Sequence, residues 1–243
     1  MGPLDLVNLT PLMERTSGRA EIKVGLIDGP VAMDHPDLAG QNIREVAGKF
    51  GGACSRASSA ACMHGTFVAG MLSAKRGSVA PAICPGCTLL VRPIFAETAL
   101  ANGDMPSAMP EELAAAIIDT VNAGARLINL SAALARPSAE GERELEAALN
   151  YAARHNVIVV VAAGNQGTVG SSVITGHTWA IPVAACDLQG RMMAVSNLGS
   201  SIGRNGLTAP GDNITSLGTN GKAQTSVGTS AAVPFVVGAG GPF

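Results

Sequence analysis

The sequence has 243 residues, of which 47% are apolar and 14% are charged, with a net charge of −2. This balance excludes a disordered chain, and the scattered Lys and Arg residues exclude the basic surface of a nucleic-acid-binding protein. No apolar run reaches the roughly 18 residues of a membrane span, so we expect one domain with a buried core and neither a nucleic-acid nor a membrane partner.

The first 20 residues form an N-terminal extension ahead of the predicted domain. They lack both the basic start and the apolar stretch of a secretory signal peptide. We therefore expect a cytoplasmic protein, with the extension over residues 1–20 and the folded domain over residues 21–243.

Apolar runs without inward–outward alternation, typical of strands covered on both faces, alternate with helical patterns. In chain order we predict a strand over 21–28, a helix over 64–75, a strand over 88–95, a helix over 110–124, a strand over 126–131, a helix over 138–156 and a strand over 157–165. This alternation implies right-handed crossovers. The predicted fold class is α/β, with a central, mostly parallel sheet and helices on both faces.

The remaining segments are dominated by loop-forming residues. Residues 96–109, 166–178 and 196–226 are predicted to be rich in loops. After them, "VGTSAAVPF" at 227–235 predicts an apolar helix that opens near Ser230. Pro234 is compatible with this start, because the N–H that it lacks would bond only to the carbonyl of Ser230.

Five cysteines leave several pairings open. Cys84 and Cys87 have a metal-like spacing, and Cys54 and Cys62 offer a second pair, but the seven-residue gap of that pair fits zinc poorly. A local disulfide in either pair is the alternative, which a reducing compartment disfavours. We therefore expect unpaired, partly buried thiols and no metal.

Nucleotide-binding motifs are absent. The strand "VGLIDG" is not followed by G-x-G-x-x-G, and "GTNGKAQTS" at 218–226 lacks the Walker spacing and its Ser or Thr. We expect no cofactor.

Open parallel sheets bind their ligands beyond the carboxyl ends of the strands, so we expect the reactive residues there. Asp28 ends the first predicted strand, His64 opens a predicted helix, and Ser230 opens another. Each alone has a structural explanation, as a turn residue, a solvated side chain and a helix cap. Together, in this chain order, they match one known order of the Ser-His-Asp triad.

The motifs around these residues extend the match. They are "LIDGP" and "HPDL" near Asp28, "HGTFVAG" at 64–70, "AAGNQG" at 162–167, "TAPGDNI" at 208–214 and "GTSAAVP" at 228–234. Over residues 21–240 the chain resembles the subtilisin-like serine proteases, which implies the subtilisin-like fold. The tripeptide Asp28-Gly29-Pro30 resembles the branch that matures cyanobactin-like ribosomal peptides.

The resemblance implies a role for each catalytic residue. Ser230 is the nucleophile, His64 takes its proton and returns it to the leaving amine, and Asp28 orients the imidazole. Asn165 matches the family's oxyanion residue, and its side-chain amide and the Ser230 N–H would bind the developing oxyanion.

Substrate-binding positions follow from the same resemblance. The walls of the S1 pocket match the ends of two strands, Gly176 leaves the pocket floor open, and Gly103 pairs with an extended substrate. The predicted positions are Gly103, Ser131, Ala132, Ala133, Ala162, Ala163, Gly164 and Gly176. Ordinary sheet and loop packing is the alternative explanation for all of them.

Two departures from the family bear on the reaction. Only 35 residues separate Asp28 from His64, whereas macrocyclising members of the cyanobactin branch carry a long helical insertion there, so we expect hydrolysis rather than transpeptidation. The loop "KRGSVAPA" at 75–82 lacks the calcium-binding segment of secreted subtilisins, so we expect no strong calcium site.

The leading hypothesis is a serine endopeptidase that acts on a peptide or protein, including the processing of a ribosomal precursor peptide. The first alternative is a pseudoprotease that binds extended peptides without turnover. The second alternative keeps the triad but hydrolyses esters or amides of small molecules.

Overall fold

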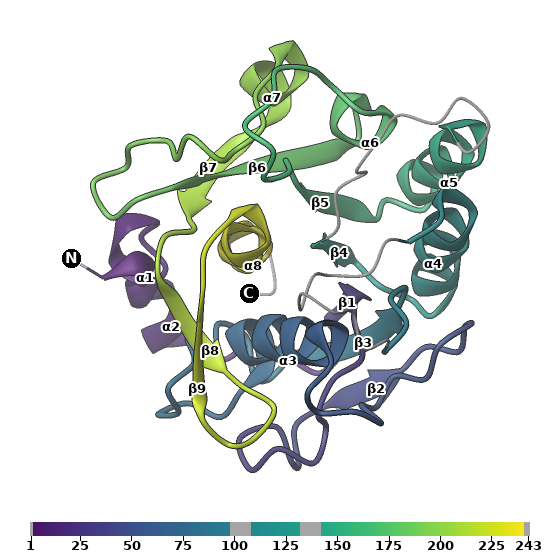
Figure 1. Ribbon diagram of the computed structural model, residues 1–243. Helices are drawn as coiled ribbons and strands as arrows, with labels where there is room; N and C mark the ends of the chain where they lie inside the picture. Colours follow the sequence, from purple (N-terminus) through teal and green to yellow (C-terminus); the bar gives the residue numbers. More distant parts are fainter. Residues whose placement is uncertain (1, 98–107, 132–141, 241–243) are drawn as a thin grey trace.

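The computed structural model describes residues 2–97, 108–131 and 142–240. A seven-stranded sheet lies at the centre of this part of the chain, with helices on both faces (Figure 1). All six strand pairings of the sheet are parallel. The predicted α/β class, with a central, mostly parallel sheet, is therefore confirmed.

The strand order places the carboxyl end of β1 at a topological switch point. The strands are β1 (Lys23–Asp28), β2 (Ile43–Glu45), β3 (Thr88–Pro93), β4 (Leu127–Leu130), β5 (Ile158–Ala162), β6 (Ala180–Cys186) and β7 (Leu207–Pro210), with a separate antiparallel pair of β8 (Ile214–Leu217) and β9 (Ala223–Ser226). The order in the sheet is β2-β3-β1-β4-β5-β6-β7. Because β3 and β4 flank β1 on opposite sides, a crevice is expected beyond Asp28, the last residue of β1.

Two apolar cores lie on opposite faces of the sheet. The helices are α1 (Pro3–Leu6), α2 (Thr10–Arg15), α3 (Ala60–Ser73), α4 (Pro110–Asn122), α5 (Glu142–Arg154), α6 (Val173–Gly176), α7 (Ser200–Asn205) and α8 (Thr229–Ala239). On β5, Val160 packs with α3 and α8, whereas its neighbours Val159 and Val161 pack with α4 and α5. Successive side chains thus enter opposite cores, which explains why the strand is apolar throughout.

The N-terminal extension packs against the core that contains α3 and α8. Leu9 and Met13 are buried there, and the Arg76 guanidinium, beyond the end of α3, donates a hydrogen bond of 2.9 Å to the Met13 carbonyl. Residues 2–20 are therefore integrated with the fold, and the boundary at residue 21 stays a prediction. No helix among the described residues is both long and apolar enough to cross a membrane.

One predicted helix boundary is wrong. The helix that carries His64 begins at Ala60, because the Ser59 hydroxyl caps it by accepting a 3.1 Å hydrogen bond from the Cys62 N–H. Two of the segments predicted to be rich in loops also contain short elements, since residues 166–178 contain α6 and residues 196–226 contain α7, β7, β8 and β9. These elements have four to six residues each, and β9 alternates exposed and half-buried positions, so none produces a long apolar run.

Candidate active site

Asp28 lies at the end of β1, and its side chain is fully buried. Its Oδ1 accepts hydrogen bonds of 2.6 Å from the Gly29 N–H and 2.7 Å from His64 Nδ1. Its Oδ2 is buried without a hydrogen-bond partner among the described residues. A buried carboxylate in this position favours a positive charge on the neighbouring ring.

His64 lies in the second turn of α3, and its side chain is 17% exposed. Because the Asp28 carboxylate accepts at Nδ1, the ring proton is assigned to Nδ1, and Nε2 is left with a lone pair. The free lone pair on the partly exposed ring is the arrangement of a general base.

Close backbone packing brings His64 within reach of Asp28. A Cβ atom on Gly29 would overlap the Ala61 carbonyl, and a Cβ atom on Gly65 would overlap the Gly29 and Pro30 carbonyls. Only glycines at these two positions allow the first turns of α3 to lie directly on the segment that follows β1.

This packing predicts a large effect for Gly65→Ala. The new methyl group would push α3 away from Gly29, with a loss of about 1–3 kcal/mol of unfolding free energy from overpacking and a marked loss of activity. Gly203→Ala is the matched control, since Gly203 is helical and a Cβ atom there meets nothing within 4 Å. Urea unfolding and hydrolysis assays measure both effects, and a fully stable, fully active Gly65→Ala protein would contradict the packing argument.

Ser230 is the second residue of α8 and is 9% exposed. Gly228 directly precedes the helix and has a φ of 131°, a backbone conformation that residues other than glycine rarely adopt. Within the described residues, neither the N–H nor the hydroxyl of Ser230 makes a hydrogen bond. The structure therefore joins Asp28 to His64 but not His64 to Ser230. Catalytic hydrogen bonds are often open in unliganded enzymes and form with substrate.

Asn165 lies beside the start of α8, three residues beyond the end of β5. Its Oδ1 accepts hydrogen bonds from the N–H (2.8 Å) and the hydroxyl (3.0 Å) of Thr229. The Thr229 hydroxyl in turn accepts from the Gly164 N–H at 3.2 Å. Because the amide oxygen is held in this way, the Nδ2 group is identified as the free end. A Cβ atom on Gly228 would lie 2.8 Å from this nitrogen, so the amide group lies at the N-terminus of α8.

Asn165→Ala should lower kcat on the order of 10²–10³-fold, because it removes one preorganised oxyanion donor. KM should change little, since the donor acts mainly on the transition state. Steady-state kinetics on a peptide substrate measure the effect. A wild-type kcat in a folded Asn165→Ala protein would contradict this role.

The pKa of His64 is raised above the ordinary value of 6.5. Burial alone would lower this pKa, but the charge of Asp28 and its hydrogen bond together outweigh the burial. The neutral ring is needed as a base, so kcat/KM should fall as the pH drops through this raised pKa, above pH 6.5. The stabilisation from the His64–Asp28 ion pair runs the other way: it is complete below pH 6.5 and is lost as the pH rises through the raised pKa. A kcat/KM profile with its acidic midpoint below 6.5 would contradict this assignment.

Part of the predicted substrate-binding set lies together. Ser131 directly follows β4, Ala162 is the last residue of β5, which pairs with β4, and Ala163 and Gly164 directly follow β5. The Ser131 hydroxyl accepts a 2.7 Å hydrogen bond from the Asn129 amide. These residues share the carboxyl edge of the sheet with Asp28, as expected for a pocket wall, and their role stays a prediction.

Of the other predicted substrate residues, the structure describes only Gly176. Gly103, Ala132 and Ala133 lie outside the described residues. Gly176, at the end of α6, lines an open cavity of about 460 Å³ together with Glu146, Asn150, Val173, His177 and Thr178. Within the part of the chain that the structure describes, this lining includes neither His64 nor Ser230.

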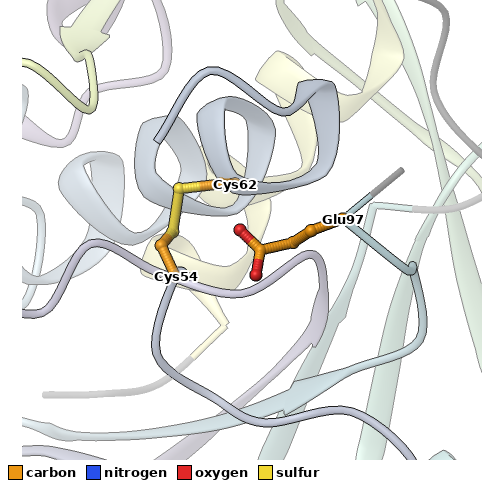
Figure 2. Close-up of side chains that lie close together, drawn as sticks. All are labelled: Cys54, Cys62 and Glu97. Carbon is orange, nitrogen blue, oxygen red and sulfur yellow. A yellow bond between two sulfur atoms is a disulfide. The ribbon is translucent and has the colours of Figure 1, made fainter. Parts of the chain in front are cut away.

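A group with the chemistry of metal ligands lies at the first turn of α3. One ligand atom each of Cys54, Cys62 and Glu97 lies within 4.8 Å of the others (Figure 2). Cys54 and Cys62, however, form a disulfide, which leaves no thiolate for a metal. The expectation of unpaired thiols is wrong for this pair, because α3 begins early enough to bring Cys62 to a Cα–Cα distance of 5.6 Å from Cys54.

Cys84 and Cys87 are both buried, and their side chains hydrogen-bond to one another. This bond and burial raise the pKa of Cys84 well above its ordinary value, whereas the same bond lowers the pKa of Cys87. The two pairs therefore do not combine into the four-thiolate site that their spacings allow.

Two residues of the site had no predicted role. Thr229 donates a hydrogen bond to Asn165 Oδ1. The sequence feature that could have indicated this role is the position of Thr229 inside the "GTSAAVP" motif. Gly65 allows α3 to pack closely on the segment that follows β1. The sequence feature that could have indicated this role is the position of Gly65 directly after His64 in "HGTFVAG".

Comparison with known proteins shows which family the chain matches. The model of the subtilase family matches residues 19–241. Fervidolysin from Fervidobacterium pennivorans is 30% identical over 257 residues, which cover 97% of this chain and 36% of that protein. The chain spans between about a third and just over half of the length of the first curated relatives that it matches.

Two solved structures share the fold at similar identity. The protease domain of PatA is 32% identical, with a TM-score of 0.83, and the match covers 91% of this chain and 78% of that one. The prenylagaramide maturation protease PagA is 31% identical, with a TM-score of 0.82, and the match covers 95% of this chain and 78% of that one.

Proposed function

This chain belongs to the subtilase family, and we propose that it is a serine endopeptidase that hydrolyses peptide bonds with Asp28, His64 and Ser230. The observation that carries the proposal is the 2.7 Å hydrogen bond from His64 Nδ1 to a buried carboxylate, which leaves Nε2 of the partly exposed ring as the free nitrogen among the described residues. A serine hydroxyl needs such a base to become a nucleophile.

In the proposed reaction, a substrate carbonyl lies at the amino end of α8. His64 Nε2 takes the Ser230 proton as the hydroxyl attacks, and Asp28 stabilises the resulting imidazolium. The Asn165 amide and the Ser230 N–H, which have no acceptor among the described residues, receive the oxyanion. The imidazolium then protonates the leaving amine, and water completes the hydrolysis.

We further propose that the substrate is a ribosomal precursor peptide. The likeness to PatA and to the prenylagaramide maturation protease PagA supports this substrate class. Between Asp28 and the start of α3 the chain forms only β2, with no additional helix in residues 29–59, all of which the structure describes. This compact connection supports hydrolysis as the outcome.

The proposed unit is a single peptidase domain over residues 21–243, with the extension packed against it. A cytoplasmic location stays a prediction. The Cys54–Cys62 disulfide is a bond that persists mainly in oxidising compartments, and it weighs against that location.

Incubation with a library of unmodified peptides tests the proposal. Mass spectrometry should detect internal cleavage by the wild-type protein and none by His64→Ala. Cleavage of ester substrates without any peptide cleavage would contradict an endopeptidase, and equal cleavage by His64→Ala would contradict the catalytic base.

A further inference from the structure

The Cys54–Cys62 disulfide lies two residues from His64 along the chain. Cys62 is fully buried in the first turn of α3, and Cys54 is half-buried in the loop that precedes the helix (Figure 2). The disulfide therefore connects the first turn of α3, which directly precedes the turn that holds the imidazole, to a separate segment of the chain.

That segment is also bonded to the residues after Asp28. The Cys54 N–H donates to the Val31 carbonyl at 3.0 Å, and the Val31 N–H donates to the Gly52 carbonyl at 2.8 Å. The path Asp28–Val31–Cys54–Cys62–His64 thus closes on itself through the His64–Asp28 hydrogen bond. The disulfide is the covalent cross-link within this closed path, which contains two of the proposed catalytic residues.

Glu97, which belongs to a third segment of the chain, bonds to residues that lie between Cys54 and Cys62. Its Oε2 accepts from the N–H (2.8 Å) and hydroxyl (2.5 Å) of Ser55, and its Oε1 accepts from the Arg56 N–H (2.8 Å) and the Ser59 hydroxyl (3.3 Å). Burial would raise the pKa of Glu97, but these hydrogen bonds lower it overall, so the group is ionised at neutral pH. Since Ser59 caps α3, Glu97 supports the start of the helix through Ser59.

We propose that the Cys54–Cys62 disulfide, supported by Glu97, is a positioning element for His64, and that its reduction by a dithiol switches catalysis down. Without the bond, the first turn of α3 is no longer covalently tied to Cys54, whose N–H is hydrogen-bonded to the Val31 carbonyl. The imidazole then spends less time aligned on Asp28, and the catalytic step slows. For its activity readout this inference rests on the proposed function.

The chemical step is thiol–disulfide exchange. A thiolate of the dithiol attacks Cys54 Sγ, the sulfur on the less buried side, and the electron pair of the S–S bond moves to Cys62 Sγ, which takes up a proton. The second thiol of the reagent then displaces Cys54 Sγ. The protein gains two thiols, and the reagent is oxidised to a disulfide.

The first experiment compares the oxidised and the reduced full chain. Dithiothreitol is the reductant, and a chelator is present so that the three potential ligand atoms acquire no metal. Thiol counting by mass spectrometry verifies the redox state. We expect kcat to fall on the order of 10–100-fold with little change in KM, since a small misplacement of a catalytic group has effects of this size. Reoxidation should restore kcat.

Two kinds of variant accompany this comparison. Cys54→Ser/Cys62→Ser should have the reduced kcat and no response to dithiol, whereas Cys186→Ala, at the end of β6, should respond as the wild type does. Glu97→Gln keeps the disulfide and should lower kcat less than reduction does. Circular dichroism confirms that each protein is folded.

The pKa of His64, followed by NMR, separates positioning from general stability and does not require activity. Reduction should lower this pKa, because the contact with Asp28 weakens. If kcat and the His64 pKa are both unchanged in fully reduced, folded protein, the inference is overturned. If the protein cleaves nothing in either state while the pKa still falls on reduction, the proposed function fails and the positioning role stands.

Discussion

Replacement of Ser230 by alanine should abolish peptide hydrolysis, with kcat lower on the order of 10⁶-fold. The hydroxyl is the only atom of the site that is proposed to bond covalently to the substrate. The start of α8 should remain intact, because the Asn165–Thr229 contacts do not involve the Ser230 side chain. Peptide affinity should therefore persist, and equilibrium binding together with single-turnover kinetics measures both properties.

Ser58→Ala is the matched control, since Ser58 is exposed and belongs to no element of the site. It should leave kcat unchanged. If Ser230→Ala retained more than a trace of activity that co-purifies with the folded protein, another nucleophile would have to act, and the role of α8 would be wrong.

Replacement of Asp28 by asparagine should lower kcat on the order of 10⁴-fold. The carboxylate holds the ring proton on Nδ1. An asparagine amide that donates to Nδ1 instead would place the proton on Nε2, where the base must be free. Because Asp28 is buried and its Oδ2 has no partner among the described residues, the isosteric amide should fit without a large loss of stability.

A second readout distinguishes this cause from simple damage. In Asp28→Asn the burial of His64 remains while the raising effect of the charge is lost, so the pKa of His64 should drop. A His64 pKa that is unchanged in this variant, measured by NMR, would show that Asp28 does not control the ring.

The central part of the fold and the contact between Asp28 and His64 were predictable from particular residues. β1, β3, β4 and β5 are buried on both faces, which produces continuous apolar runs that end close to Asp28, Ser131 and Asn165. The long motif around each reactive residue then favoured a catalytic role over a structural explanation as a turn residue, a solvated side chain or a helix cap. The structure brings Asp28 and His64 into contact and places Asn165 at the start of α8.

The features that escaped prediction depend on contacts between distant segments. The early start of α3 depends on the Ser59 cap and on Glu97, which is 38 residues further along the chain. The burial of Leu9 and Met13 depends on a core that the N-terminal residues alone do not reveal. Cys54 and Cys62 are separated by eight positions, a spacing that without the helix boundary does not indicate whether two thiols meet.

The most direct test of the central claim is the site and rate of modification by a fluorophosphonate, which reacts with serines activated by a neighbouring base. We predict one phosphonyl adduct, located on Ser230 by peptide mapping, with formation rates that fall sharply in His64→Ala and Asp28→Asn. An adduct on a different residue, or one that forms at the wild-type rate without His64, would contradict the account.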